Sequence, residues 1–121
     1  MFNVAYTKKM KRNLHKIWML LILLTVARLS AQAVDSLFVQ ANKLYQSEKY
    51  AEALQVYSDI EKKGIVSYEL YYNIANTYYK TNEVAQSVYY YEKALQIKPN
   101  DEDVLFNLDF ANRMTIDNIE P

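Results

Sequence analysis

The chain has 121 residues, with 14 Lys and Arg against 14 Asp and Glu, no cysteine and a single glycine. This length fits one domain. The absence of cysteine excludes disulfide frameworks, zinc fingers and thiol nucleophiles, and a single glycine excludes glycine-rich phosphate loops. Because 51% of the residues are hydrophobic and 12 are tyrosines, the composition predicts a packed, largely helical protein without a cofactor.

The zero net charge is the sum of two segments of opposite sign. Residues 1–33 contain six basic residues and no acidic one, whereas residues 34–121 contain 14 acidic and 8 basic residues. A negatively charged segment repels phosphate backbones. We therefore predict no nucleic-acid partner, and we expect any charged partner to be basic.

The first segment has the order of a secretory signal peptide. A basic stretch from Lys8 to Lys16 precedes 11 mostly apolar residues, 17–27, and these are followed by small residues that include Ala31 and Ala33. This order is typical of an exported protein. We predict cleavage after Ala33 or after Ala31, with translation starting at Met1 or Met10. The alternative is an uncleaved membrane anchor, although Arg28 shortens the apolar run below the roughly 20 residues of a spanning helix.

The rest of the chain repeats itself at one fixed offset, here called the repeat offset, which carries position 38 onto position 72. Aromatic residues fall on aromatic residues and small residues on small ones: Phe38 on Tyr72, Ala41 on Ala75, Asn42 on Asn76, Tyr45 on Tyr79, Ala53 on Ser87 and Tyr57 on Tyr91. Each unit contains two helical stripes separated by a short polar break at residues 46–49 or 81–83, which predicts antiparallel helix pairs. We expect the second pair at residues 68–80 and 84–97.

Several residues mark where these helices end. Gly64 is expected to terminate the second helix of the first unit, and Pro99 closes the second unit. Asn100 or Asp101 is expected to cap a third segment that carries Val104, Leu105, Leu108 and Ala111 on one stripe. In the run of residues 89–91, we expect Tyr91 in the core and Tyr89 exposed. We attribute the acidic residues 101–103 to capping rather than to a calcium site.

A helix–turn–helix unit of this length, about 34 residues, resembles the tetratricopeptide repeat. The likeness is best at residues 71–80 and 91–99. It implies an all-α helical-repeat solenoid. After the signal peptide at 1–33, we expect repeats at 34–67 and 68–101, and a capping helix with a C-terminal tail at 102–121. Residues 100–121 further resemble the segment that follows the repeats in BatE-type proteins of the Bacteroides aerotolerance (Bat) family, which are exported, membrane-associated tetratricopeptide proteins.

The first helices of stacked repeats line a concave groove, and eight residues are expected there: Phe38, Asn42, Tyr45, Gln46, Tyr72, Asn76, Tyr79 and Lys80. Asn42 and Asn76 resemble the asparagines by which some tetratricopeptide domains hold a peptide backbone or a terminal carboxylate. The lysine that a full carboxylate clamp requires one turn earlier is Phe38 here. The alternative interpretation of these positions is solvated asparagine and aromatic packing.

We therefore predict an exported, periplasmic or membrane-associated interaction module of a Gram-negative bacterium. Its expected ligand is a protein or peptide in the groove, and the Bat resemblance implies other Bat-type membrane proteins as partners. The alternatives are a structural spacer, or a truncated fragment of a longer protein, without peptide binding. An enzyme would have to use Asp, Glu, Lys and Tyr alone, because residues 34–121 contain no His or Cys.

Overall fold

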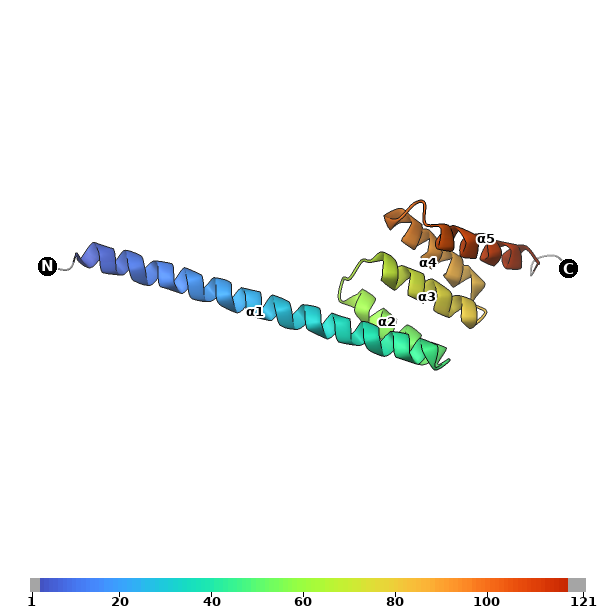
Figure 1. The fold of residues 1–121 in the computed structure, drawn as a ribbon, viewed down its shortest axis with the longest axis horizontal. Coiled ribbons are helices and arrows are strands. Elements are labelled where there is room, and N and C mark those ends of the chain that lie inside the picture. Colours follow the sequence, from blue (N-terminus) through green and yellow to red (C-terminus); the bar gives the residue numbers. More distant parts are fainter. Residues whose placement is uncertain (1–2, 118–121) are drawn as a thin grey trace. The chain divides into compact units, whose positions relative to one another are not determined.

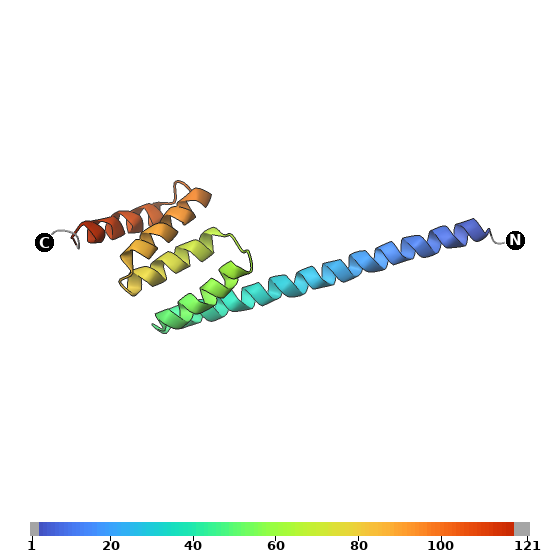
Figure 2. The same cartoon turned by 180° about the vertical axis from the view of Figure 1, so that it is seen from behind.

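The computed structural model describes residues 3–117, and within them the chain forms five helices and no strand (Figures 1 and 2). They are α1 (Val4–Gln46), α2 (Tyr50–Lys62), α3 (Tyr68–Lys80), α4 (Val84–Ile97) and α5 (Glu102–Asp117). The chain divides into two compact units, Met1–Asp35 and Ser36–Pro121; the second contains the end of α1 and all of α2 to α5. The predicted all-α class is confirmed. Residues 118–121 of the predicted tail lie outside the described residues.

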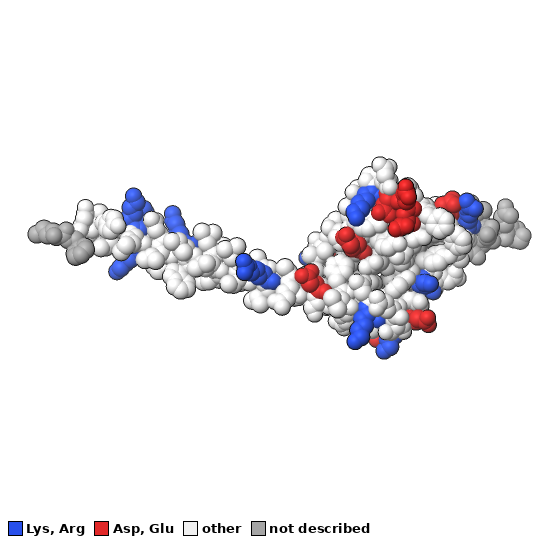
Figure 3. All heavy atoms as spheres, viewed as in Figure 1, with Lys and Arg blue, Asp and Glu red and all other residues white. Residues whose placement is uncertain are grey.

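The first unit is the N-terminal part of α1. Its large apolar side chains from Ile17 to Leu24 are between 49% and 63% exposed, and its charged residues before Asp35 are all basic (Figure 3). By length and composition this segment could cross a membrane. The helix continues without a break through the predicted cleavage residues Ala31 and Ala33, because residues 4–46 contain no glycine or proline to end it.

The turns inside the two helical pairs have the same geometry. Glu48 and Asn82, which are related by the repeat offset, both adopt the left-handed conformation, with φ of 61° and 62°. After each of them, the next amide bonds back to a carbonyl five residues earlier: Lys49 N to Leu44 O, and Glu83 N to Tyr78 O, both at 2.9 Å. This is a Schellman termination of the first helix. The repeat in the sequence is therefore a repeat in backbone conformation.

Three other helix ends carry local signals, of which Gly64 and Asp101 were predicted from the sequence and Ser67 was not. The Oγ of Ser67 accepts a hydrogen bond from the Leu70 amide at 3.1 Å at the start of α3. The Oδ1 of Asp101 accepts one from the Val104 amide at 3.1 Å at the start of α5. Gly64, with φ of 80°, lies just past the end of α2. These contacts satisfy amides that a helix leaves unpaired at its first turn.

The core of the second unit alternates small and large side chains. Ala41, Ala53, Ala75, Ser87, Ala94, Val104 and Ala111 are fully buried, and Tyr57, Ile60, Leu70 and Tyr91 are buried beside them. The small residues permit close approach of the helices, and the large ones fill the remaining volume. Tyr91 is 1% exposed and Tyr89 is 55% exposed, as the sequence predicts. The prediction for Leu105 was wrong: it is 45% exposed, because the buried face of α5 is centred on Val104 and Ala111.

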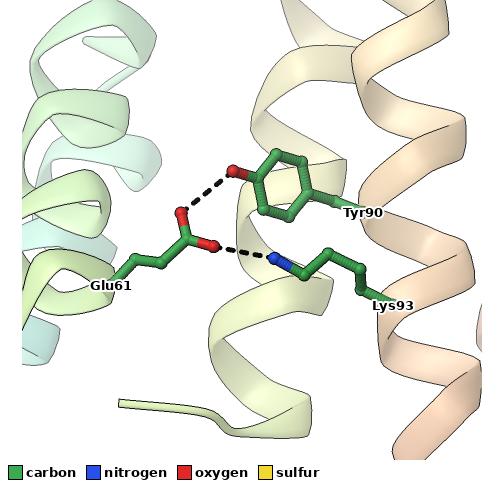
Figure 4. A network of polar contacts seen from close by, with 3 residues as sticks. All are labelled: Glu61, Tyr90 and Lys93. Carbon is green, nitrogen blue, oxygen red and sulfur yellow. Dashed lines mark hydrogen bonds and ion pairs between the residues drawn. The ribbon is translucent and has the colours of Figure 1, made fainter. Parts of the chain in front are cut away.

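Successive helices pack side by side, with α3 between α2 and α4, and α5 against α4 (Figures 1 and 2). A polar cluster joins α2 to α4 across this stack (Figure 4). Glu61 accepts a hydrogen bond from the Tyr90 hydroxyl and forms an ion pair with Lys93, each at 2.9 Å. The Lys93 ammonium also lies 4.2 Å from the centre of the Tyr71 ring. The cluster therefore connects the first helical pair to the second.

Candidate peptide-binding groove

Two hollows lie next to each other on the second unit, and Tyr45 and Asn76 line both of them. The larger has a volume of about 370 Å³ and is lined by Tyr45, Tyr72, Asn76, Tyr79, Lys80, Tyr91, Phe106, Asn107 and Phe110. The smaller has a volume of about 230 Å³ and is lined by Asn42, Tyr45, Gln46, Tyr57, Asn73 and Asn76. The two hollows together are called the recess here, and their lining residues come from the end of α1 and from α2 to α5.

Aromatic rings form most of the wall of the larger hollow. The Tyr79 ring contacts Phe110 edge to face, with centroids 6.1 Å apart. The Tyr72 ring lies 6.3 Å from that of Tyr91 and stacks on Tyr68 at 5.7 Å. Packed rings of this kind present apolar area at little cost in conformational entropy, and the tyrosine hydroxyls add polar contacts. The hollow is therefore suited to apolar or aromatic side chains.

Both asparagines that were predicted for the groove, Asn42 and Asn76, are held by a tyrosine of the following helix. The Tyr57 hydroxyl donates to Asn42 Oδ1 at 2.6 Å, and the Tyr91 hydroxyl donates to Asn76 Oδ1 in a short hydrogen bond. The two contacts are related by the repeat offset. Asn73 Nδ2 also donates to Asn42 Oδ1, at 3.1 Å. Since these bonds use the side-chain oxygens, they fix the orientation of each amide.

The tyrosines stay neutral, which makes them donors in these contacts. The pKa of Tyr57 is raised from 10.0 to about 12, mainly by burial, and the nearby Tyr45 also raises it. Burial likewise raises the pKa of Tyr91 well above its ordinary value. Within the described residues, the Nδ2 groups of Asn42 and Asn76 donate to no other side chain or backbone oxygen. Each asparagine thus offers an N–H donor to a ligand.

One charged residue, Lys80, lines the larger hollow. It is exposed, and it forms no ion pair with another residue in the part of the chain that the structure describes. The same part contains no group of three or more His, Asp or Glu residues that could hold a metal ion. The chemical groups of the recess are aromatic rings, amides, hydroxyls and one ammonium, which suit the binding of a ligand that has both apolar and polar groups.

The structure brings together seven of the eight predicted groove residues. Tyr72, Tyr79 and Lys80 line the larger hollow, Asn42 and Gln46 the smaller, and Tyr45 and Asn76 line both. Phe38 lines neither hollow and is half-buried.

Six lining residues were not predicted for the groove. The repeat offset carries Tyr72, Asn73 and Asn76 onto Phe106, Asn107 and Phe110, so the offset itself was the signal that could have found them. Tyr91 was predicted in the core; Tyr91 and its repeat equivalent Tyr57 are both buried there and also line the recess. Asn73 was not predicted as a groove residue.

Residues 68–101 match the tetratricopeptide repeat family. This stretch is a tetratricopeptide repeat. Repeats of this family generally bind proteins or peptides and are typically not catalytic. A search of curated proteins finds no match, so the BatE-type resemblance of residues 100–121 stays a prediction.

Proposed function

We propose that the second unit binds an extended peptide segment of a partner protein in the recess lined by Asn42 and Asn76. The observation that carries the proposal is the repeated tyrosine–asparagine hydrogen bond. Because each side-chain oxygen already accepts a tyrosine hydroxyl, the amide presents its N–H group, and backbone carbonyl oxygens of an extended peptide are the matching acceptors. Two such donors at equivalent positions of adjacent repeats suit a ligand that runs along the groove.

The aromatic wall of the larger hollow would take apolar side chains of this peptide. A volume of about 370 Å³ lies within the range of ligand pockets. Lys80 at this hollow would contribute a charge contact to a carboxylate of the ligand. We expect burial of the side chains to supply most of the affinity, and the asparagine donors to set the position of the backbone.

We further propose that the N-terminal segment exports the repeat domain or holds it at the membrane, where it serves as a scaffold of a Bat-type complex. The basic residues and the exposed apolar run of α1 support export or anchoring. The resemblance of residues 100–121 supports the Bat-type partners. The mass of the chain recovered from cells distinguishes export with cleavage from anchoring at the membrane, since cleavage after Ala31 or Ala33 removes the N-terminal segment.

Binding is tested with Asn42→Asp and Asn76→Asp in the full chain in mild detergent, using a displayed library of random peptides as the probe. Aspartate keeps an oxygen that accepts the tyrosine hydroxyl but removes the N–H donors, so we expect folding to be preserved and peptide binding to be weakened. We expect each variant to weaken capture of selected peptides about tenfold, the cost of one buried hydrogen bond to a peptide oxygen. Glu69→Gln on α3, exposed and outside both hollows, is the control. Equal capture by all variants would contradict the role of Asn42 and Asn76, and a library that yields no binder of the wild-type chain would favour a spacer without peptide binding.

A further inference from the structure

The helix α5 presents two phenylalanine rings to solvent. Phe106 is 71% exposed and Phe110 is 51% exposed, and they lie one turn apart on the side opposite the fully buried Val104 and Ala111. Helices at the edge of a repeat stack usually have a polar outer face. The inner edge of Phe110 packs on Tyr79, so this ring is held in place. The face of α5 around Phe106 and Phe110, here called the α5 face, is a fixed apolar surface without a cover among the described residues.

The preceding repeat shows what covers the equivalent surface there. The repeat offset carries Tyr72 onto Phe106 and Asn76 onto Phe110. On α3, one tyrosine of the next helix covers both positions, since Tyr91 packs on Tyr72 and donates to Asn76. Phe110 has no oxygen to accept such a hydrogen bond. The cover of the α5 face must therefore be apolar at this point.

Asp109 sets how closely a covering helix can approach. It is the repeat equivalent of Ala75, which lies at the contact between α3 and α4. There the Ala75 carbonyl accepts a hydrogen bond from the Ser87 hydroxyl at 2.9 Å, and both side chains are fully buried. The Asp109 carboxylate is 62% exposed and is paired with Arg113 at 2.7 Å. Burying it against a helix at that distance is costly. A covering helix must lie farther away, at the separation that large side chains fill.

We infer that the cover is a second copy of this chain, with the two α5 helices antiparallel around a twofold axis. The charges along α5 favour this arrangement: Glu102 and Asp103 lie in its first turn, and Arg113 lies in its second half. Antiparallel pairing brings the acidic end of each helix beside Arg113 of the other copy and sets Phe106 against Phe110 of the other copy. A parallel pair would bring like charges together. The face is self-complementary, as a twofold interface requires.

The pairing also affects the groove, because Phe106 and Phe110 line the larger hollow as well. A paired α5 face closes that hollow and leaves the smaller one, lined by Asn42, open. Peptide and second copy then compete for the same rings. This consequence rests on the proposed peptide binding; the pairing itself does not.

Cysteine cross-linking of the full chain tests the arrangement, because the chain has no cysteine of its own. Chains carrying Phe106→Cys and chains carrying Phe110→Cys are given different tags, expressed together and oxidised in isolated membranes. We expect a mixed disulfide dimer that exceeds the dimer of either variant alone. Asn112→Cys, exposed but off the α5 face, is the control. A mixed dimer no stronger than the Asn112→Cys dimer, or a stronger Phe106→Cys dimer by itself, would overturn the antiparallel pairing.

The mass of the full chain in detergent micelles, measured against concentration without any peptide, tests the energetics. Phe106→Gln should weaken dimerisation at least about a hundredfold, because the substitution is present in both copies and therefore removes two rings from the twofold interface. Val66→Gln, at a side chain of the same exposure, 70%, should leave it unchanged. Arg113→Glu should weaken dimerisation, and adding Glu102→Arg to the Arg113→Glu chain should restore it. A wild-type chain that stays monomeric would overturn the inference and leave a peptide, or a further segment of a longer chain, as the cover.

Discussion

Glu61 on α2 binds two residues of α4 at once, and its loss should weaken the contact between the two helical pairs (Figure 4). The perturbation is Glu61→Gln, Lys93→Met and their combination. Glutamine keeps the length of the side chain and an oxygen for Tyr90 but removes the charge. Methionine keeps the apolar stem of Lys93 over the tyrosine rings and removes the ammonium.

The size of the effect follows from the burial of the pair. The Lys93 and Glu61 side chains are 22% and 29% exposed, with the Nζ and Oε1 atoms 2.9 Å apart. Exposed ion pairs contribute about 0.2–1 kcal/mol, whereas buried hydrogen bonds to charged groups contribute about 1.5–3 kcal/mol. A partly buried pair lies between these values. We expect a coupling of about 1 kcal/mol, and a loss of unfolding free energy of that size lowers the melting temperature by about 4–8 °C in a unit of this size.

Thermal unfolding of the four chains, followed by circular dichroism at 222 nm, gives the coupling as a double-mutant cycle. The control is Asp59→Asn on the same helix. Asp59 pairs with Lys62 at 3.8 Å, and those side chains are 48% and 69% exposed. Asp59→Asn should therefore change the free energy of unfolding by no more than about 0.5 kcal/mol. A coupling below about 0.3 kcal/mol, or an equal effect of Asp59→Asn, would refute the conclusion that the cluster joins the repeats.

Three further predictions concern stability. Tyr91→Phe should cost about 1 kcal/mol, because it leaves the half-buried Asn76 Oδ1 without its donor; chemical denaturation measures it, and an unchanged midpoint would contradict it. Glu48→Gly should stabilise the unit by about 1 kcal/mol, since Glu48 has a φ of 61°; a lower melting temperature would contradict that. Burial raises the pKa of Tyr57 to about 12, so its neutral form favours the fold. The resulting stability is fully present below pH 10 and is lost as the pH rises toward 12. Phenolate absorbance and helix content should therefore change together. Full ionisation of the tyrosines near pH 10 with the helices intact would exclude this coupling.

The helical pairs could be predicted from the sequence because their ends are local. The break at residues 81–83 and the cap at Asp101 depend on neighbours within five residues, and the observed bounds of α3 and α4 agree with the expected ones. The continuity of α1 was not predicted, because the signal-peptide order describes how a chain is processed rather than whether its residues form a helix. Leu105 was misplaced because a stripe read from the sequence does not show which side of α5 meets α4.

The groove was predicted from the repeat offset for seven residues, since equivalent positions of a repeat face the same way. The hydrogen bond from Tyr91 to Asn76 could not be predicted, because the two residues lie 15 positions apart and meet only when α4 folds back on α3. Phe106 and Phe110 were missed because α5 was interpreted as a cap, although the offset also places them at groove positions.

In the proposed function, the side-chain amides of Asn42 and Asn76 donate hydrogen bonds to a peptide in the recess. The most direct measurement is the nuclear magnetic resonance spectrum of the full chain in micelles, labelled at asparagine, during titration with a peptide selected from the library. We expect the side-chain amide signals of Asn42 and Asn76 to shift together and to saturate with the peptide, while those of Asn82 and Asn100, outside both hollows, stay in place. Saturable peptide binding that leaves the Asn42 and Asn76 amides unchanged would contradict this proposal.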